Sequence, residues 1–477
     1  MTKGGIAGGL SYITSVRRLS GVIAAITAIC WGVVVESSIF TDAVQNVFAI
    51  FAFTLILWLT KAVPYVVSST FTVVLLVVLG GAPSFRVAAS GFASSLVFFL
   101  LLVFLLGIAI DKVNLDRWFA SRLLADGSQS PRPIHSVAIH VFALAFVMPS
   151  AVARATTFVP IIEEMAASFG LEEGSDFERA AFLVLGHVNT IASMALMTAG
   201  GMALVTSEII RTTVTPMGWA EWAVYMVPPV VVLYGLTAGA ASRLYGPSSR
   251  EHLEVDGGVS PDTGTLRTLD PEQRLVAVTM VGAVSLWIIG SFHGIPAIVP
   301  AALAVAVLTF PGVDILTADE MLDVSWGILF VVGAMFSLLN RMESVDALQF
   351  LVQSIGGAIP FYALTSWQSI GVLLLLAACI RAVFSTGSAA ILVILPIVLR
   401  LGAGLGIDQL SLAFGVLLVV GSTTVFPFNT TAVLVTKEQG PLTTHDVVCF
   451  GLVTMVCSIF VVALSWVAYW PWIKSLF

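Results

Sequence analysis

Apolar stretches long enough to cross a lipid bilayer recur from Leu19 to the end of the chain. A helix of roughly 20 apolar residues crosses the hydrocarbon layer of a membrane, which is about 30 Å thick. Only 10% of the residues are charged and 58% are hydrophobic, whereas about 25% of the residues in a soluble domain are charged. Because backbone groups inside a membrane must be hydrogen-bonded internally, these stretches predict an all-α polytopic membrane protein.

The chain divides into two arms on either side of one long polar segment, residues 243–274, which is rich in Gly, Pro, Ser and charge. Each arm combines uninterrupted spans with one re-entrant hairpin and one broken helix. In the first arm we expect spans at 19–35, 43–60, 62–80, 96–110 and 219–241, a hairpin at 135–167 and a broken helix at 180–207. In the second arm we expect spans at 275–291, 295–310, 324–340 and 447–470, a hairpin at 367–399 and a broken helix at 410–435. Counted together with the two broken helices, the total is about eleven spans plus two hairpins.

The two hairpin tips have similar sequences. Small and hydroxyl residues begin at Ser150 and at Thr386, 236 residues apart, and each cluster ends in Pro-Ile within apolar sequence. Breaks in the following helices are expected near residues 198–201 and 427–431. Paired interrupted helices in two halves of a membrane protein are typical of inverted-repeat transporters, whose binding site lies at the repeat interface.

Basic residues are unevenly distributed between the two sides of this topology. With the N-terminus inside, fourteen Lys and Arg residues fall on the inner face and five on the outer face. Since cytoplasmic loops carry the excess of positive charge, we expect a multi-pass protein of the cell (inner) membrane with a cytoplasmic N-terminus and an extracytoplasmic C-terminus. The two arms are then inverted relative to each other.

Exposed amide groups at the start of a helix favour anions, and hydroxyl side chains there can cap the helix and contact a ligand. Close helix packing is the alternative explanation for small residues at these positions. The predicted anion site consists of Ser150, Arg154, Thr198, Thr386, Gly387, Ser388 and Thr430.

Unwound backbone in the broken helices exposes carbonyl oxygens, which are suitable ligands for a small hard cation such as sodium. Ordinary kinks also contain Gly and Pro, so this prediction is the weaker of the two. The predicted sodium ligands are Ser150, Ser193, Gly200, Thr386 and Asn429.

Two basic residues, Arg154 and Arg381, lie inside predicted membrane segments. A buried arginine costs at least about 2.5 kcal/mol on insertion scales, and is therefore a functional candidate. Arg154 could bind an anion directly, replace a coupling cation, or pair structurally with a backbone carbonyl. The same three roles are open to Arg381, and for this residue the structural pairing is favoured more strongly.

The chain contains no HExxH or GxSxG motif, no phosphate-binding loop and no paired intramembrane aspartates. The residues that usually carry enzyme catalysis are therefore missing. We expect no catalytic residues and no cofactor other than coupling sodium ions. His187 is interpreted as a core residue. The four cysteines are expected to be buried packing thiols, without a metal or disulfide role.

At both tips, and in residues 58–64 and 112–117, the sequence resembles the divalent-anion/sodium symporter family. It departs from the Ser-Asn-Thr signature of that family: Ala151 and Val152 follow Ser150, and Thr386-Gly387-Ser388 forms the second tip. The resemblance implies a homodimeric elevator carrier, in which a scaffold domain holds a transport domain that moves through the membrane. It also implies sodium coupling and a small anionic substrate.

The expected domains follow from this resemblance. Residues 1–134 and 273–366 form the scaffold, 135–245 and 367–477 form the transport domain, and 246–272 form a cytoplasmic linker. The expected function is secondary active transport of a dicarboxylate, sulfate or similar oxyanion, with sodium symport. The alternatives are a sodium-independent proton-coupled carrier or anion exchanger, and less favourably a cation/proton antiporter. No nucleic-acid partner is expected.

Overall fold

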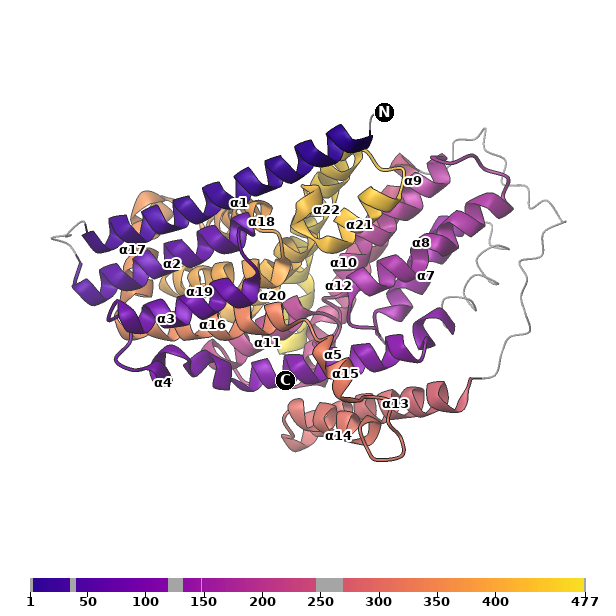
Figure 1. The fold of residues 1–477 in the computed structure, drawn as a ribbon, viewed down its shortest axis with the longest axis horizontal. Helices are drawn as coiled ribbons and strands as arrows, with labels where there is room; N and C mark the ends of the chain where they lie inside the picture. The colour runs from indigo at the N-terminus through magenta and orange to yellow at the C-terminus, as the bar shows by residue number, and fades with distance from the viewer. Residues whose placement is uncertain (1–2, 35–39, 119–131, 147, 246–268, 476–477) are drawn as a thin grey trace. The chain divides into compact units, whose positions relative to one another are not determined.

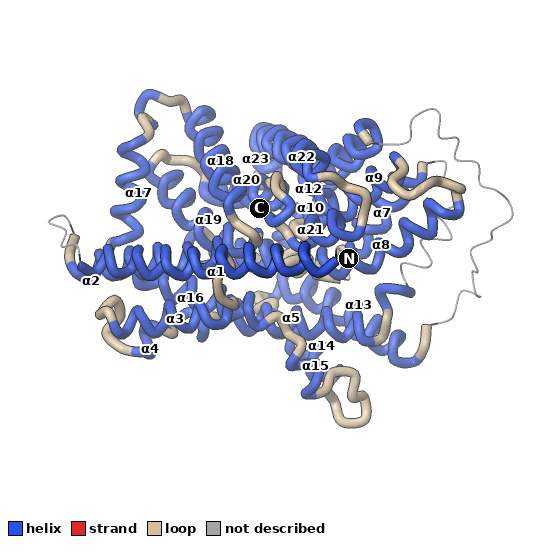
Figure 2. Tube along the Cα trace, turned by 45° about the horizontal axis from the view of Figure 1, so that its top comes forward, coloured by secondary structure: helices blue, strands red, loops and turns tan. Residues whose placement is uncertain are grey.

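The computed structural model describes residues 3–34, 40–118, 132–146, 148–245 and 269–475. All regular structure in these ranges is helical and none is strand, as Figure 2 shows. The predicted all-α class is therefore confirmed. The predicted linker lies outside the described residues, apart from residues 269–272.

The chain folds into two compact units, each built from two separate stretches of sequence. Unit 1 comprises residues 1–98 and 325–365, and unit 2 comprises 99–324 and 366–477. The boundaries at residues 98 and 325 fall inside the two predicted scaffold segments. Compact packing does not identify which part of a carrier moves, so the division into scaffold and transport domains stays a prediction.

Unit 1 consists of helices (Figure 1), and η1 and α16 approach each other closely. A Cβ atom on Gly91 would lie 2.2 Å from the carbonyl oxygen of Gly333, and the Gly91 amide donates to Ser337 Oγ at 3.0 Å. Glycine at both positions therefore allows η1 to pack directly on α16. The unit contains α1 (Lys3–Val34), α2 (Asp42–Thr60), α3 (Tyr65–Val78), α4 (Phe85–Ala88), η1 (Ser90–Ala93), α16 (Trp326–Ser344), α17 (Ala347–Ala358) and η3 (Phe361–Ala363).

Unit 2 contains both predicted hairpins and both broken helices. The first hairpin is α7 (Pro133–Leu144) with α8 (Ala151–Ser168), and the second is α18 (Ser366–Val383) with α19 (Gly387–Gly404). The first broken helix comprises α9 (Asp176–Leu183), the π-helical turn η2 (Val184–Val188), α10 (Asn189–Ala192) and α11 (Gly201–Thr213). The second comprises α20 (Gln409–Ser422), η4 (Pro427–Asn429) and α21 (Thr431–Gln439).

The remaining helices of unit 2 are α5 (Ser95–Lys112), which begins in unit 1, α12 (Trp219–Leu244), α13 (Pro271–His293), α14 (Ile298–Leu308), α15 (Ala318–Leu322), α22 (Thr444–Leu464), the π-helical turn η5 (Ser465–Tyr469) and α23 (Trp470–Lys474).

Eight helical stretches among the described residues are long and apolar enough to cross a membrane, and two of them are arms of the second hairpin. The predicted span at 19–35 falls on the C-terminal part of the longer helix α1 (Lys3–Val34), and the predicted spans at 62–80 and 295–310 correspond to shorter apolar helices at 65–78 and 298–308. Pro64 explains one of these differences, since α3 begins only after it. The protein is a polytopic membrane protein.

The prediction of buried cysteines is wrong. All four thiols are free, with Cys30 and Cys379 exposed and Cys449 and Cys457 half-buried. In a bilayer the helix exterior faces hydrocarbon, so an apolar side chain does not need a protein core to avoid water.

Candidate functional site

The first hairpin turns at Pro149-Ser150, as predicted. Ser150 has extended backbone geometry and its side chain accepts a hydrogen bond from the Ala153 amide at 3.2 Å, which caps the N-terminus of α8. The Ser150 side chain is exposed. Its hydroxyl is therefore accessible to a ligand at the tip.

The second hairpin packs its tip against the start of α11. A Cβ atom on Gly387 would lie 2.1 Å from Sδ of Met202, so a larger residue here would force the Met202 side chain or the tip to shift. A Cβ atom on Gly201 would similarly lie 2.9 Å from Ser388 Oγ. Thr386 precedes α19 in extended geometry without capping it by its side chain. The predicted residues Gly387 and Ser388 thus adjoin the first broken helix.

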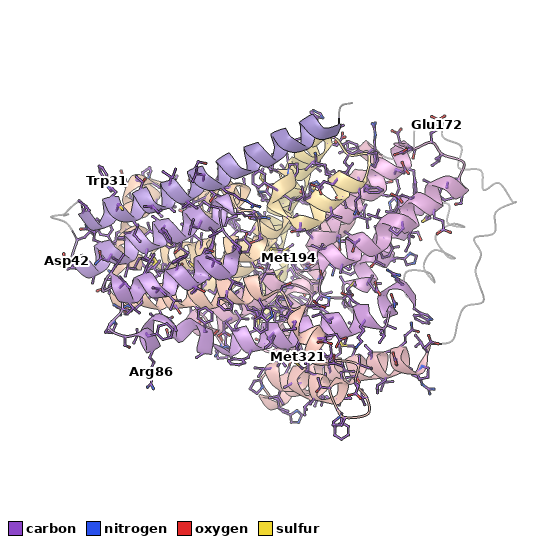
Figure 3. All side chains as sticks on the ribbon, viewed as in Figure 1. Trp31, Asp42, Arg86, Glu172, Met194 and Met321 are labelled. Atoms are coloured by element: carbon purple, nitrogen blue, oxygen red, sulfur yellow. The ribbon has the colours of Figure 1, made fainter. Side chains whose placement is uncertain are left out.

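Both predicted helix breaks are present. α-Helical structure stops over residues 193–200 and 423–430, two stretches of equal length 230 residues apart, and the second of them includes the short 3-10 helix η4. Across the first break, a Cβ atom on Gly200 would lie 2.8 Å from Cβ of Ser193, so the predicted sodium ligands Ser193 and Gly200 are in contact. Met194, labelled in Figure 3 among the helices, approaches α20 so closely that a Cβ on Gly421 would lie 2.2 Å from its Sδ.

Arg154 connects the first hairpin to the first broken helix. Its side chain is 0% exposed, and Nη1 donates to the Met148 carbonyl at 2.5 Å. Nε donates to Asn189 Oδ1 at 2.7 Å, and Nη2 donates to the Asn189 carbonyl at 3.2 Å and to Ser193 Oγ at 2.7 Å. These contacts favour the structural alternative for Arg154 in this conformation.

Arg381 connects the second hairpin to the second broken helix in a comparable way. Its Nη1 donates to the Phe384 carbonyl at 2.8 Å, at the hairpin tip. Nε donates to the Val420 carbonyl at 3.0 Å and Nη2 to the Asn429 carbonyl at 2.8 Å. The guanidinium therefore joins the tip to the last turn of α20 and to η4 within the helix break.

A buried asparagine completes each connection. Asn189 donates its side-chain amide to the Ala151 carbonyl at 2.7 Å, and Asn429 donates to the carbonyls of Ala382 at 2.8 Å and Phe384 at 2.9 Å. Asn189 is a site residue that the sequence interpretation did not identify. Its position before a predicted break, on an otherwise apolar helix, was the available signal.

The two guanidinium groups are held by neutral oxygens. Among the described residues, no ion pair involves Arg154 or Arg381. Buried cations without a carboxylate partner leave positive potential in a low-dielectric region, which favours an anion nearby. This electrostatic feature agrees with the predicted charge of the substrate.

Other predicted residues lie at the margins of this arrangement. Thr198 Oγ1 accepts a hydrogen bond from Trp219 Nε1 at 3.1 Å, and Thr430 directly precedes α21. His187 is buried in η2, where Nδ1 lies 2.7 Å from Thr424 Oγ1 on the second broken helix. Its Nε2 has no hydrogen-bond partner among the described residues, so only one of the two ring nitrogens of this core histidine is hydrogen-bonded there.

The sequence was compared with known families and proteins. The profile of a family described as "Sodium:sulfate symporter transmembrane region" matches residues 15–476. A protein from Cupriavidus necator described as "Membrane protein" is 25% identical over 390 residues, which cover 75% of this chain and 74% of that protein.

Several relatives have transport names, and two of them serve as examples. "Dicarboxylate transporter 1, chloroplastic" of Arabidopsis thaliana is 24% identical over 333 residues, or 68% of this chain and 59% of the relative. "L-tartrate/succinate antiporter" of Escherichia coli (strain K12) is 22% identical over 293 residues, or 60% of each. The chain therefore spans about three fifths of the length of these two relatives.

Proposed function

Because the chain belongs to the sodium:sulfate symporter family, we propose that it is a secondary active carrier of a small divalent anion, such as a dicarboxylate or sulfate. Membership in a family of transporters agrees with the expectation that the protein is not an enzyme. The names of the relatives from Arabidopsis and Escherichia coli support a dicarboxylate as the first substrate to test.

The observation that carries the proposal is the pair of hairpin tips, each connected to a broken helix through a buried guanidinium, Arg154 or Arg381. The anion would lie near the N-termini of α8 and α19, where helix dipoles and unpaired amides favour negative charge. Ser150, Thr386 and Ser388 would supply hydroxyl donors. The two guanidinium groups would act on the anion through their charge and by fixing the tips.

Sodium coupling is part of the proposal. The unwound residues 193–200 and 423–430 offer backbone carbonyls, and the exposed Ser150 hydroxyl adds a side-chain oxygen. Sodium bound there would offset the charge of the anion, so that the two bind cooperatively. Gly200, Thr386 and Asn429 would supply further sodium ligands at the tips and breaks.

One contact favours a second candidate, a sodium-independent anion exchanger or proton-coupled carrier. Ser193 Oγ, a predicted sodium ligand, lies 2.7 Å from Arg154 Nη2. A guanidinium and a sodium ion about 4 Å apart repel each other by about 4 kcal/mol at an effective dielectric constant near 20. Arg154 would then replace one sodium ion as a fixed charge.

The proposal also includes an elevator movement in a homodimer embedded in the cell membrane, with the N-terminus in the cytoplasm. The resemblance to dimeric elevator carriers supports this part. Within unit 2, α8 packs on α21 and α19 packs on α11, so each hairpin contacts the broken helix of the opposite repeat. Such cross-packing would let the hairpins and broken helices move as one body.

The deciding experiment is uptake of radiolabelled succinate, citrate, sulfate and aspartate into proteoliposomes, with and without an inward sodium gradient. Uptake of one dianion that requires sodium supports the symporter. Uptake that is stimulated by internal anion and indifferent to sodium supports the exchanger. Absence of uptake for every anion, in protein shown to be folded, would contradict the proposed function.

A further inference from the structure

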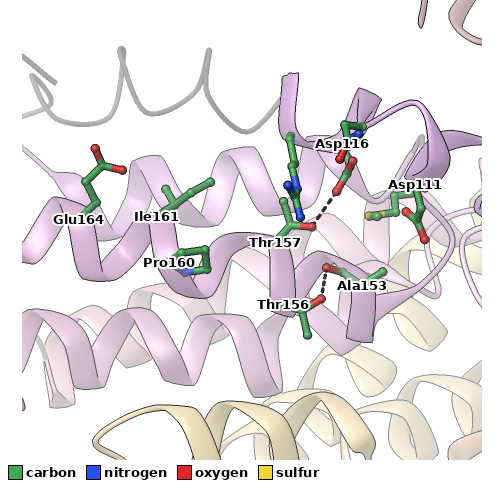
Figure 4. Close-up of a pocket in the computed structure, with 11 residues that line it drawn as sticks. Asp111, Asp116, Ala153, Thr156, Thr157, Pro160, Ile161 and Glu164 are labelled. Carbon is green, nitrogen blue, oxygen red and sulfur yellow. Dashed lines mark hydrogen bonds between the residues drawn. The ribbon is translucent and has the colours of Figure 1, made fainter. Parts of the chain in front are cut away.

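A polar cavity lies beside the first hairpin, between the end of α5 and helix α8 (Figure 4). Its volume is about 630 Å³. The polar residues that line it are Asp111, Asn114, Asp116, Arg117, Thr156, Thr157 and Glu164. In Figure 4, Asp111 and Asp116 lie at the same end of the cavity, and Glu164 lies at the other end.

Asp116 is 6% exposed, and only one of its two carboxylate oxygens accepts a hydrogen bond among the described residues. Thr157 on α8 donates its hydroxyl to Asp116 Oδ2 at 2.8 Å, whereas Oδ1 is buried and has no hydrogen-bond partner among the described residues. A buried carboxylate oxygen without a partner is costly unless a cation or a hydrogen-bond donor is close to it. Asp116 lines the cavity, so a cation bound there lies next to this carboxylate.

The nearby basic side chains do not fill this role. Lys112 is paired with Glu320, with 2.5 Å between Nζ and Oε1. Arg117 lines the cavity, but in the described part of the chain it forms no ion pair with Asp111 or Asp116. Among the described residues, the two carboxylates at this end of the cavity therefore have no ion-pair partner.

We propose that Asp116 and Asp111 form a binding site for sodium, separate from the hairpin tips. Carboxylate and amide oxygens are suitable ligands for hard cations. Nowhere in the described ranges do three His, Cys, Asp or Glu side chains come together to hold a metal ion. That arrangement argues against a multi-carboxylate chelate and fits a weakly held monovalent ion completed by water.

The site is connected to the first hairpin. Thr157 lies three residues beyond Arg154 on α8, so the Thr157–Asp116 hydrogen bond ties the hairpin arm to the segment that follows α5. Sodium on Asp116 would orient the carboxylate in this contact and hold the arm in place. The inference deepens the proposed function, because it adds an ion site to the carrier, but its test needs no substrate.

The test uses the full-length protein with Thr156→Cys as a reporter at the cavity wall. Maleimide modification of that residue is followed by mass spectrometry in sodium chloride and in choline chloride of equal ionic strength. We expect sodium to slow modification several-fold. Asp116→Asn should abolish this protection, and the nearly isosteric Thr157→Val, which removes only the orienting hydroxyl, should weaken sodium affinity about tenfold.

Glu164→Gln is the matched control, since it removes a carboxylate at the far end of the same cavity and should leave protection unchanged. Equal rates in sodium and choline would overturn the inference, as would protection by acidification without a sodium effect. Protection that appears only in Arg117→Gln would also overturn it, by identifying Arg117 as the natural counter-ion. None of these outcomes depends on whether the protein transports an anion.

Discussion

Arginine suits the two buried positions because its guanidinium presents five donors in a fixed plane. Arg154 uses this geometry to reach three residues at once: Met148, Asn189 and Ser193. Lysine has the charge but cannot copy this set of directions. The role of Arg154 therefore depends on its partners, and Asn189 contributes both an amide oxygen and a backbone carbonyl.

At this scale we predict that Asn189→Leu destabilises the protein. The change leaves Arg154 Nε without its acceptor and removes one of the hydrogen bonds to the Ala151 carbonyl, and an unsatisfied buried group costs about 1–3 kcal/mol. The measurement is thermal unfolding of the purified protein in detergent. Asn340→Leu is the control, because Asn340 is exposed and its loss should matter little. Equal unfolding temperatures for the two variants would mean that the Arg154–Asn189 contact carries no stability.

Among the helices, the contact between α19 and α11 places the second tip. Gly387 and Gly201 let the N-termini of these two helices approach closely, with Met202 filling the space between them. Small residues allow such close approach in membrane proteins, where the hydrophobic effect does not drive helices together. The position of Ser388 depends on this contact.

We predict that Gly387→Ala reduces transport, because its Cβ would meet Met202 Sδ at 2.1 Å and displace the tip. Adding Met202→Ala should restore much of the activity by removing the clash. Gly404→Ala on the same helix is the control, since a Cβ there meets nothing within 4 Å. Substrate uptake into proteoliposomes is the measurement, and Gly387→Ala with uptake equal to that of Gly404→Ala would show that the tip tolerates displacement.

For the whole molecule, the proposed elevator requires one part of the chain to move as a body relative to another. Both hairpins and both broken helices belong to unit 2, whereas α2, α3 and α16 belong to unit 1. Unit 1 takes in residues 1–98 and 325–365 of the predicted scaffold, whereas scaffold residues 99–134 and 273–324 fall in unit 2. Movement, not packing, will decide where the latter two segments belong.

We predict that disulfide cross-links between unit 1 and the hairpins change in yield when sodium or substrate is added. The cysteine pairs are introduced after replacement of the four native cysteines. A control pair across α8 and α21, which pack together within unit 2, should cross-link equally under all conditions. Constant yields for every pair would argue against an elevator and favour local gating at the tips.

The sequence by itself determined the features that depend on local sequence and on the membrane as solvent. Apolar segment length predicted the all-α polytopic fold, and Pro, Gly and hydroxyl clusters predicted the turn at Ser150 and both helix breaks. The hydrogen-bond partners of Arg154 and Arg381 were decided by the tertiary structure. These partners include asparagines 35 and 48 residues away, and the pairing depends on which helices pack together. Burial of Asp116 and exposure of Cys30 depend on that packing too, so local sequence did not reveal them.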